Sequence, residues 1–269
     1  GEDLEHIEDH VPYAELVPFA QTIQSDRLLR QNNERMRREF TANVSHELKT
    51  PLTSISGYAE LIEAGMAKPQ DVTVFAGRIR TEAARLQSLV ADIIQLSQLD
   101  GMSSEAAEGQ APEQAKFAPV SLLALARRCT ESLALNAQKA YVTLLAEGED
   151  LTVQGNQRLL EELCFNLCDN AIRYNRPGGR VILHVETRDG HPTLRVEDNG
   201  IGIPPEHQAR VFERFYRVDK IRSKATGGTG LGLAIVKHIA LLHGAQLKLE
   251  SRENEGTTIT VLFPVQSKK

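Results

Sequence analysis

Two long helical patterns in the first hundred residues constrain the fold more than any other feature. Residues 70–100 carry apolar side chains at alternating spacings of four and three, which is a heptad-like seam. The seam consists of Val72, Ala76, Ile79, Ala83, Leu86, Val90 and Ile93. A second pattern over 25–63 precedes a short turn with Gly65 and Pro69. Together they predict an antiparallel helical hairpin.

One hairpin cannot cover its own apolar stripe. Pairing with a second copy would bury both stripes in a four-helix bundle, so the pattern favours a homodimer. The alternative, in which the hairpin packs on the C-terminal part of its own chain, stays open at this point.

The rest of the chain predicts a second domain. Residues 101–116 are small and polar, which is typical of a flexible linker. Beyond them, helices are expected over 122–135, 157–174 and 230–243, and strands over 141–145, 151–153, 181–187, 193–198, 246–251 and 257–264. This irregular mixture predicts an α+β sandwich with helices on one face of a mixed sheet. The expected division is a connector (1–24), the hairpin (25–100), the linker (101–116), the α+β domain (117–266) and a tail (267–269).

Composition excludes several classes of partner. The net charge is −5 and Trp is absent, so neither a basic field nor a stacking platform for nucleic acid is expected. No run approaches the roughly 18–20 apolar residues of a membrane span. Because the chain begins with Gly1, we interpret it as a fragment, whose parent protein would reach a membrane only through a segment outside it. Cys164 and Cys168, four residues apart, are interpreted as buried apolar residues, with a zinc pair as the alternative.

The segment FTANVSHELKTP (40–51) places one histidine opposite the apolar face of its helix. At roughly 100° per residue, Val44 and Leu48 point away from His46, whereas Thr50 shares its face. An exposed neutral imidazole can accept a phosphoryl group, and the adjacent Glu47 can orient the ring and take its proton. Pro51 is expected to loosen or bend the helix.

A second helix, 157–174, presents an unusual polar face. Glu162, Asn166 and Asn170 recur every four residues, and Arg173 and Tyr174 follow on the same side. Amide and carboxylate oxygens suit Mg²⁺, which prefers oxygen ligands. The ordinary alternative is a solvated helix face.

Two glycine-containing segments complete the pattern. DNGIGI follows a strand and offers Asp198 as an acceptor beside Gly200 and Gly202, whose backbone can approach a flat base. The segment 227–232 (GGTGLG) leads into an apolar helix, whose N-terminus would favour phosphate. It matches neither the Walker nor the Rossmann order of glycines. Between them, Arg217 in FERFYR (212–217) is a candidate phosphate contact.

In their order and spacing, these segments resemble the motifs of sensor histidine kinases, with a HisKA phosphoacceptor domain followed by a HATPase_c domain, and most closely the PhoR-like type. The resemblance implies an ATP-binding domain of the Bergerat (GHKL) fold. It implies autophosphorylation on His46 with Glu47 as general base, and then transfer to an aspartate of a response regulator receiver domain. Glu47 and Thr50 are the residues linked to a phosphatase activity toward that regulator. It also implies the cytoplasmic part of a protein anchored in a bacterial membrane.

The resemblance also assigns roles in the nucleotide site. Asn170 is the expected Mg²⁺ ligand, supported by Asn166 and Glu162, and Asp198 is expected to contact adenine. The remaining ATP contacts it implies are Arg173, Tyr174, Gly200, Gly202, Arg217, Gly228, Thr229, Gly230, Leu231 and Gly232. Two rivals stay open: a Bergerat-type ATPase without an acceptor helix, and a dimeric scaffold without catalysis. The stimulus, the cognate regulator and the choice between cis and trans transfer are left undetermined.

Overall fold

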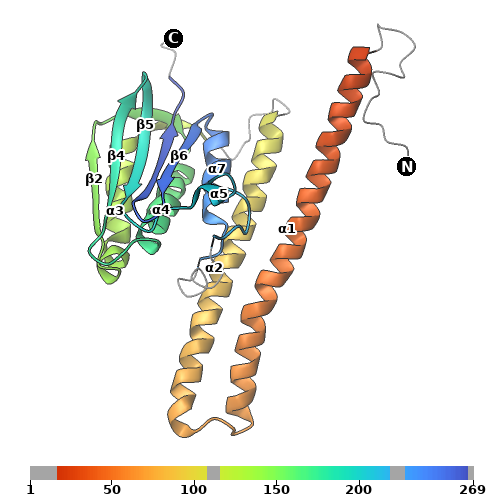
Figure 1. Cartoon of the computed structure of the whole chain (residues 1–269), viewed down its shortest axis with the longest axis vertical. Coiled ribbons are helices and arrows are strands. Elements are labelled where there is room, and N and C mark those ends of the chain that lie inside the picture. The colour runs from red at the N-terminus through yellow and green to blue at the C-terminus, as the bar shows by residue number, and fades with distance from the viewer. Residues whose placement is uncertain (1–16, 108–115, 219–227, 266–269) are drawn as a thin grey trace. The chain divides into compact units, whose positions relative to one another are not determined.

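The computed structural model describes residues 17–107, 116–218 and 228–265 (Figure 1). The chain divides into two units, Gly1–Ala83 and Ala84–Lys269. Helix α1 spans Val17–Glu63 and helix α2 spans Pro69–Ala107, so that α2 runs through the boundary between the units. The parts of the predicted connector, linker and tail at 1–16, 108–115 and 266–269 lie outside the described residues, as does the predicted ATP lid at 219–227, including Gly227.

Both long helices extend further than the sequence pattern predicted. Helix α1 begins at Val17, within the expected connector, because Pro18 is tolerated in a first helical turn and nothing after it breaks the helix. Helix α2 continues to Ala107, within the expected linker, where helix-forming Met, Glu and Ala residues outweigh Gly101. Pro51 lies inside α1, which is helical on both sides of it.

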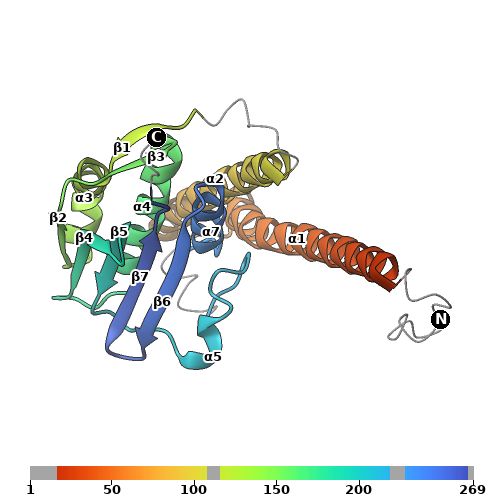
Figure 2. The ribbon, with the colours of Figure 1, turned by 90° about the horizontal axis from the view of Figure 1, so that it is seen from above.

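The second unit contains a five-stranded mixed sheet. Its strand order is β2 (Thr143–Gly148), β4 (Arg180–Arg188), β5 (His191–Asp198), β7 (Gly256–Leu262) and β6 (Gln246–Arg252) (Figure 2). Only β2 and β4 pair in parallel, and the other pairs in this sheet are antiparallel. The short strands β1 (Ala118–Ser121) and β3 (Thr152–Gly155) form a separate antiparallel pair.

Three helices cover one face of the sheet: α3 (Leu122–Lys139), α4 (Gln157–Arg173) and α7 (Gly232–Leu242) (Figures 1 and 2). Alternate residues of β4, namely Val181, Leu183 and Val185, are fully buried and form the core beneath them. Side chains fix where two of the helices begin. The Oγ of Ser121 accepts from the N–H of Ala124 at 3.1 Å, and the Oδ1 of Asn156 accepts from the N–H of Leu159 at 3.1 Å.

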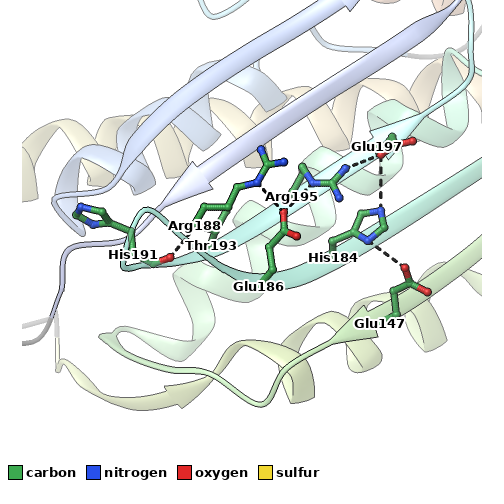
Figure 3. Close-up of polar contacts among 8 residues, drawn as sticks. All are labelled: Glu147, His184, Glu186, Arg188, His191, Thr193, Arg195 and Glu197. Atoms are coloured by element: carbon green, nitrogen blue, oxygen red, sulfur yellow. Dashed lines mark hydrogen bonds and ion pairs between the residues drawn. The ribbon is translucent and has the colours of Figure 1, made fainter.

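The opposite face of the sheet carries a ladder of charged side chains across β2, β4 and β5 (Figure 3). His184 lies between two carboxylates, with Nδ1 3.1 Å from Glu147 and Nε2 3.7 Å from Glu197. Arg195 pairs with Glu197 and, at 3.0 Å, with Glu186. This alternation of apolar and charged residues along each strand leaves one face for the helices and the other for solvent.

The predicted fold class is confirmed: a helical region precedes an α+β sandwich. Strand β1 and the short helix α5 (Pro205–Gln208) were not predicted, because four residues are too few to show a period. No helix within the described residues has both the length and the apolar composition needed to span a bilayer.

Candidate functional site

Most of the residues predicted to bind nucleotide line one cavity of about 430 Å³ in the unit Ala84–Lys269. The cavity is lined by α4, by the ends of β5 and β7, and by the glycine-rich segment before α7. The lining residues that the sequence had predicted are Asn166, Asn170, Arg173, Tyr174, Asp198, Gly202, Arg217, Gly228, Thr229, Gly230 and Gly232. Glu162, Gly200 and Leu231 were also predicted and do not line it.

Asp198 ends strand β5 and places a carboxylate at the cavity. Its Oδ1 accepts from the N–H of Gly200 at 2.8 Å, which fixes the side chain. Burial raises the pKa of Asp198 to about 6, although the hydrogen bonds from the backbone of Gly200 and Thr257 act in the opposite direction. The charged carboxylate is therefore under-solvated before a ligand arrives, which makes it a strong acceptor for an N–H donor such as the adenine amine.

Gly202 cannot be replaced without moving the backbone of the cavity wall. Its φ is +67°, and a Cβ there would lie 1.9 Å from the carbonyl oxygen of Arg252. The loop after β5 therefore packs directly on the β6–β7 turn, backbone against backbone.

Arg176 holds the same two segments together, and sequence reasoning missed it. Its guanidinium donates to the carbonyl oxygens of Asn199 (3.0 Å), Gly200 (2.9 Å) and Asn254 (2.6 Å). Three backbone acceptors on two loops make it a clamp for the DNGIGI segment. A lone arginine in the turn RPGG carries no recognisable motif, so nothing in a single sequence could have identified it.

The N-terminus of α7 faces the cavity without a side-chain cap. Leu231 precedes the helix and makes no capping hydrogen bond, so the first backbone N–H groups of α7 are available to an anion. Gly232 lies against α4, where a Cβ would come 2.9 Å from the Oδ1 of Asn166. Gly230 has a φ of +76°, and a Cβ there would lie 3.1 Å from the Nε of Arg217. The groups predicted to bind phosphate and the amide face of α4 thus meet at one place.

The polar face of α4 has the chemistry of a magnesium site. The Nδ2 of Asn166 donates to the carbonyl oxygen of Glu162 at 3.0 Å, and its Oδ1 faces Gly232 at the start of α7. Asn170, one turn later, also lines the cavity. The carboxylate of Glu162 is hydrogen-bonded to Gln95, and burial raises its pKa. The side chains of Asn166 and Asn170 carry oxygen ligands of the kind that Mg²⁺ prefers, whereas Glu162 does not line the cavity.

Helix α2 supplies residues that sequence reasoning also missed. Ser88 and Asp92 line the cavity, and the carboxylate of Asp92 is hydrogen-bonded to the side chain of Thr229. Burial raises the pKa of Asp92. Near the end of the same helix, the Oδ1 of Asp100 lies 2.7 Å from the Nη2 of Arg214 and 3.1 Å from the Nε2 of His238. Only the structure could place these acids, because they lie far from the nucleotide motifs in sequence.

The predicted phosphoacceptor residues lie on α1, in the unit Gly1–Ala83. The His46 side chain is exposed, whereas Glu47 and Thr50 are half-buried. The Oγ1 of Thr50 donates to the carbonyl oxygen of His46 at 3.3 Å, which holds Thr50 on the histidine's side of the helix. Val44 and Leu48 are half-buried, in agreement with an apolar seam away from His46.

A cavity lined by the residues predicted to bind ATP, in a chain that also carries an exposed histidine on a long helix, is typical of one class of protein: a nucleotide-binding domain linked to a helical phosphoacceptor. Comparison with known families identifies both halves. Residues 36–101 match the His Kinase A (phospho-acceptor) domain, HisKA. Residues 155–267 match HATPase_c, the histidine kinase-, DNA gyrase B- and HSP90-like ATPase. The chain belongs to the sensor histidine kinases.

Curated relatives agree with this family. The chain is 40% identical over 231 residues to the sensor-like histidine kinase SenX3 of Mycolicibacterium smegmatis, covering 86% of this chain and 58% of that protein. It is 36% identical over 239 residues to the sensor protein kinase WalK of Staphylococcus saprophyticus, covering 88% of this chain and 38% of that protein. SenX3 is PhoR-like, which agrees with the PhoR-like type that the motifs of this chain resemble. The chain thus spans a little more than half the length of SenX3 and less than half the length of WalK.

Solved structures support the fold. The histidine kinase ThkA, in a crystal structure with the response regulator protein TrrA, superposes with a TM-score of 0.68 at 23% identity, covering 95% of this chain and 68% of that one. Full-length ShkA in complex with AMPPNP superposes with a TM-score of 0.59 at 26% identity, covering 86% of this chain and 46% of that one.

Proposed function

We propose that this chain is the catalytic region of a sensor histidine kinase that transfers the γ-phosphoryl group of ATP to His46, and from there to an aspartate of a response regulator. The observation that carries the proposal is the single cavity in which the amide face of α4, Asp198 and the uncapped N-terminus of α7 converge. An acceptor histidine exposed on α1 supplies the second requirement. The response regulator bound to ThkA, a structural neighbour, supports the choice of partner.

The proposed chemistry divides between the two units. In the nucleotide site, Asp198 accepts a hydrogen bond from the adenine amine, and the N-terminus of α7 and Arg217 hold phosphate oxygens. Asn166 and Asn170 would hold Mg²⁺, which neutralises phosphate charge when bound. On α1, one ring nitrogen of neutral His46 attacks the γ-phosphorus while the bond to the ADP oxygen breaks. Glu47 takes the proton from the other ring nitrogen.

A homodimer fits the apolar side chains that the helices leave uncovered. Within Gly1–Ala83, Leu52 is 56% and Val74 is 53% exposed. Within Ala84–Lys269, Val90 is 41% and Ile94 is 54% exposed on α2. Isolated exposed apolar residues are ordinary, but a series along a helical hairpin suits burial in a four-helix bundle with a second copy.

The proposed phosphatase activity rests on Thr50. Its hydroxyl lies on the side of α1 that carries His46, where it can position a water against a phosphorylated aspartate of the regulator. We also place the full protein at a bacterial membrane, anchored through a segment outside this chain, as the sensor relatives SenX3 and WalK suggest.

The direct test is labelling with ATP carrying ³²P in the γ position. We expect acid-labile, alkali-stable label on the wild-type chain and none on His46→Gln, which should still bind ATP. His191→Gln is the matched control, because His191 is half-buried in the α+β domain and should not alter labelling. Full labelling of His46→Gln would exclude His46 as the acceptor. ATP hydrolysis without phosphohistidine in the wild type would favour an ATPase of the gyrase type.

A further inference from the structure

All three cysteines of the chain meet at one point in the core of the α+β domain. Cys129 lies on α3, and Cys164 and Cys168 lie one turn apart on α4. Their sulfur atoms are all within 4.8 Å of one another. Cys164 and Cys168 are fully buried, and Cys129 is 6% exposed. The sequence predicted the burial of Cys164 and Cys168, but it gave no reason to join Cys129 to them.

The three thiols differ in acidity because they bond to one another. Hydrogen bonds from Cys164 and Cys168 lower the pKa of Cys129 to about 5, although burial opposes this. The bond to Cys129 raises the pKa of Cys164, and burial raises that of Cys168. Cys129, the least buried member, is therefore the most readily ionised of the three thiols.

The geometry fits one ion bound by three sulfurs. Sulfurs at about 2.3 Å from a central ion lie about 4 Å apart in a trigonal plane, and about 3.5 Å apart around an ion whose lone pair makes the site pyramidal. The observed upper limit of 4.8 Å is about 1 Å larger than these distances, which rotations about the Cα–Cβ bonds can supply. Within the part of the chain that the structure describes, the cluster includes no histidine or carboxylate as a fourth ligand.

Charge selects among the ions that bind sulfur. Three thiolates around Cu⁺ or Zn²⁺ would leave a net negative charge in a dry core, where an uncompensated charge is costly. Zn²⁺ would also lack the fourth ligand of a structural zinc site. When all three sulfurs are ionised, a trivalent ion bonded to them is neutral, so it satisfies both the number of sulfurs and the burial.

We propose that Cys129, Cys164 and Cys168 form a three-thiol binding site for trivalent arsenic, supplied as arsenite. Arsenous acid, As(OH)₃, condenses with the three sulfurs: three As–S bonds form and three As–O bonds break. Each of the three hydroxyls leaves as water with one thiol proton. Arsenic stays trivalent, so no oxidant or reductant is needed. Cys129 reacts first, because it is the least buried of the three sulfurs.

The bound ion would bridge α3 to α4. Because α4 also presents Asn166 and Asn170 to the nucleotide cavity, the bridge and the nucleotide share one helix. The site does not depend on kinase chemistry, however, and can be tested without it.

The test uses the whole chain, reduced with a phosphine and titrated with sodium arsenite. We expect one arsenic per chain by native mass spectrometry, with the loss of three hydrogens. We also expect the near-ultraviolet absorption of As–S bonds and the loss of all three titratable thiols. Each of Cys129→Ala, Cys164→Ala and Cys168→Ala should weaken binding at least about a hundredfold, because the third bond forms within an already tethered complex. Ser132→Ala, on the exposed side of α3, is the matched control and should bind as the wild type does.

Three results would overturn the proposal. One is loss of only two thiols per arsenic, and another is undiminished binding by Cys129→Ala. The third is arsenite binding by the denatured chain alone. Circular dichroism and binding of an ATP analogue establish that each variant is folded. If a variant is not folded, the number of thiols lost per bound arsenic in the folded wild-type chain still tests the three-thiol site. Tighter binding of Zn²⁺ than of arsenite would also refute the argument from charge.

Discussion

Replacing Asp198 by Asn is expected to stabilise the nucleotide-free chain while weakening its binding of ATP. Burial raises the pKa of Asp198 from the ordinary 3.8 to about 6, so the folded state disfavours the carboxylate that the unfolded chain carries at neutral pH. The difference corresponds to about 3 kcal/mol. Asn retains an oxygen that can accept from the N–H of Gly200, but its amide N–H₂ group needs acceptors of its own. We therefore expect a net gain of about 1–2 kcal/mol.

The gain must depend on pH in a defined direction. The pKa of Asp198 is higher in the folded chain than in the unfolded chain, so between the two values the folded chain holds a proton that the unfolded chain has lost. Ionised Asp198 therefore lowers the free energy of unfolding most fully above pH 6, and the effect disappears well below pH 3.8. The advantage of Asp198→Asn should thus be full at pH 8 and close to zero near pH 5, and well below pH 3.8 the variant should be less stable by about 1–2 kcal/mol, because only the cost of its amide group remains. Calorimetry at pH 8 should show a rise in Tm of about 2–8 °C.

Nucleotide binding should change in the opposite sense. In the proposed mode, the carboxylate of Asp198 accepts a hydrogen bond from the adenine amine, and a bond to a charged group contributes about 1.5–3 kcal/mol. Asp198→Asn should therefore weaken a nonhydrolysable ATP analogue by about 10- to 150-fold in isothermal titration. Wild-type affinity should fall as pH drops below about 6, and this step should be missing in the variant.

Two observations would refute this reasoning. A variant that is less stable at pH 8 would show that the carboxylate is not strained by burial. An equal gain at pH 5 and pH 8 would show that the effect does not come from ionisation. Glu186→Gln is the matched control, because Glu186 belongs to the charged ladder on the other face of the sheet and is not among the groups that shift the pKa of Asp198 (Figure 3).

Three further predictions follow from the site and the helices. Gly202→Ala should abolish detectable binding of the ATP analogue, because its Cβ would lie 1.9 Å from the carbonyl oxygen of Arg252. Gly190→Ala is the control and should bind the analogue normally, because a Cβ at that turn would meet no atom within 4 Å. Arg176→Lys should lower nucleotide affinity about tenfold, because lysine cannot hold three carbonyl oxygens in a fixed fork; unchanged affinity would exclude the clamp. Val90→Lys should shift the proposed dimer toward monomer in analytical ultracentrifugation, and an unchanged sedimentation profile would exclude Val90 from the interface.

Sequence reasoning succeeded where local chemistry is repeated or dense. The heptad spacing at 72–93 predicted a long helix, and α2 spans it. The amides of α4 and the glycines before α7 were predicted to form one nucleotide site, and the structure brings Asn166 and Gly232 close together. Helix ends were less predictable, since α1 begins at Val17 through residues that carry no apolar period.

The residues that escaped prediction share a physical cause. Arg176 donates to backbone carbonyl oxygens, which every residue has. The sequence therefore contains no partner residue type from which this contact could be predicted. Asp92 lines the cavity from a helix whose pattern describes only its apolar seam. Cys129 lies 35 positions before Cys164, and only the packing of α3 on α4 makes the three thiols one group. In each case the chemistry arises from a tertiary contact between a side chain and a distant segment, and such contacts leave no periodicity or spacing in a single sequence.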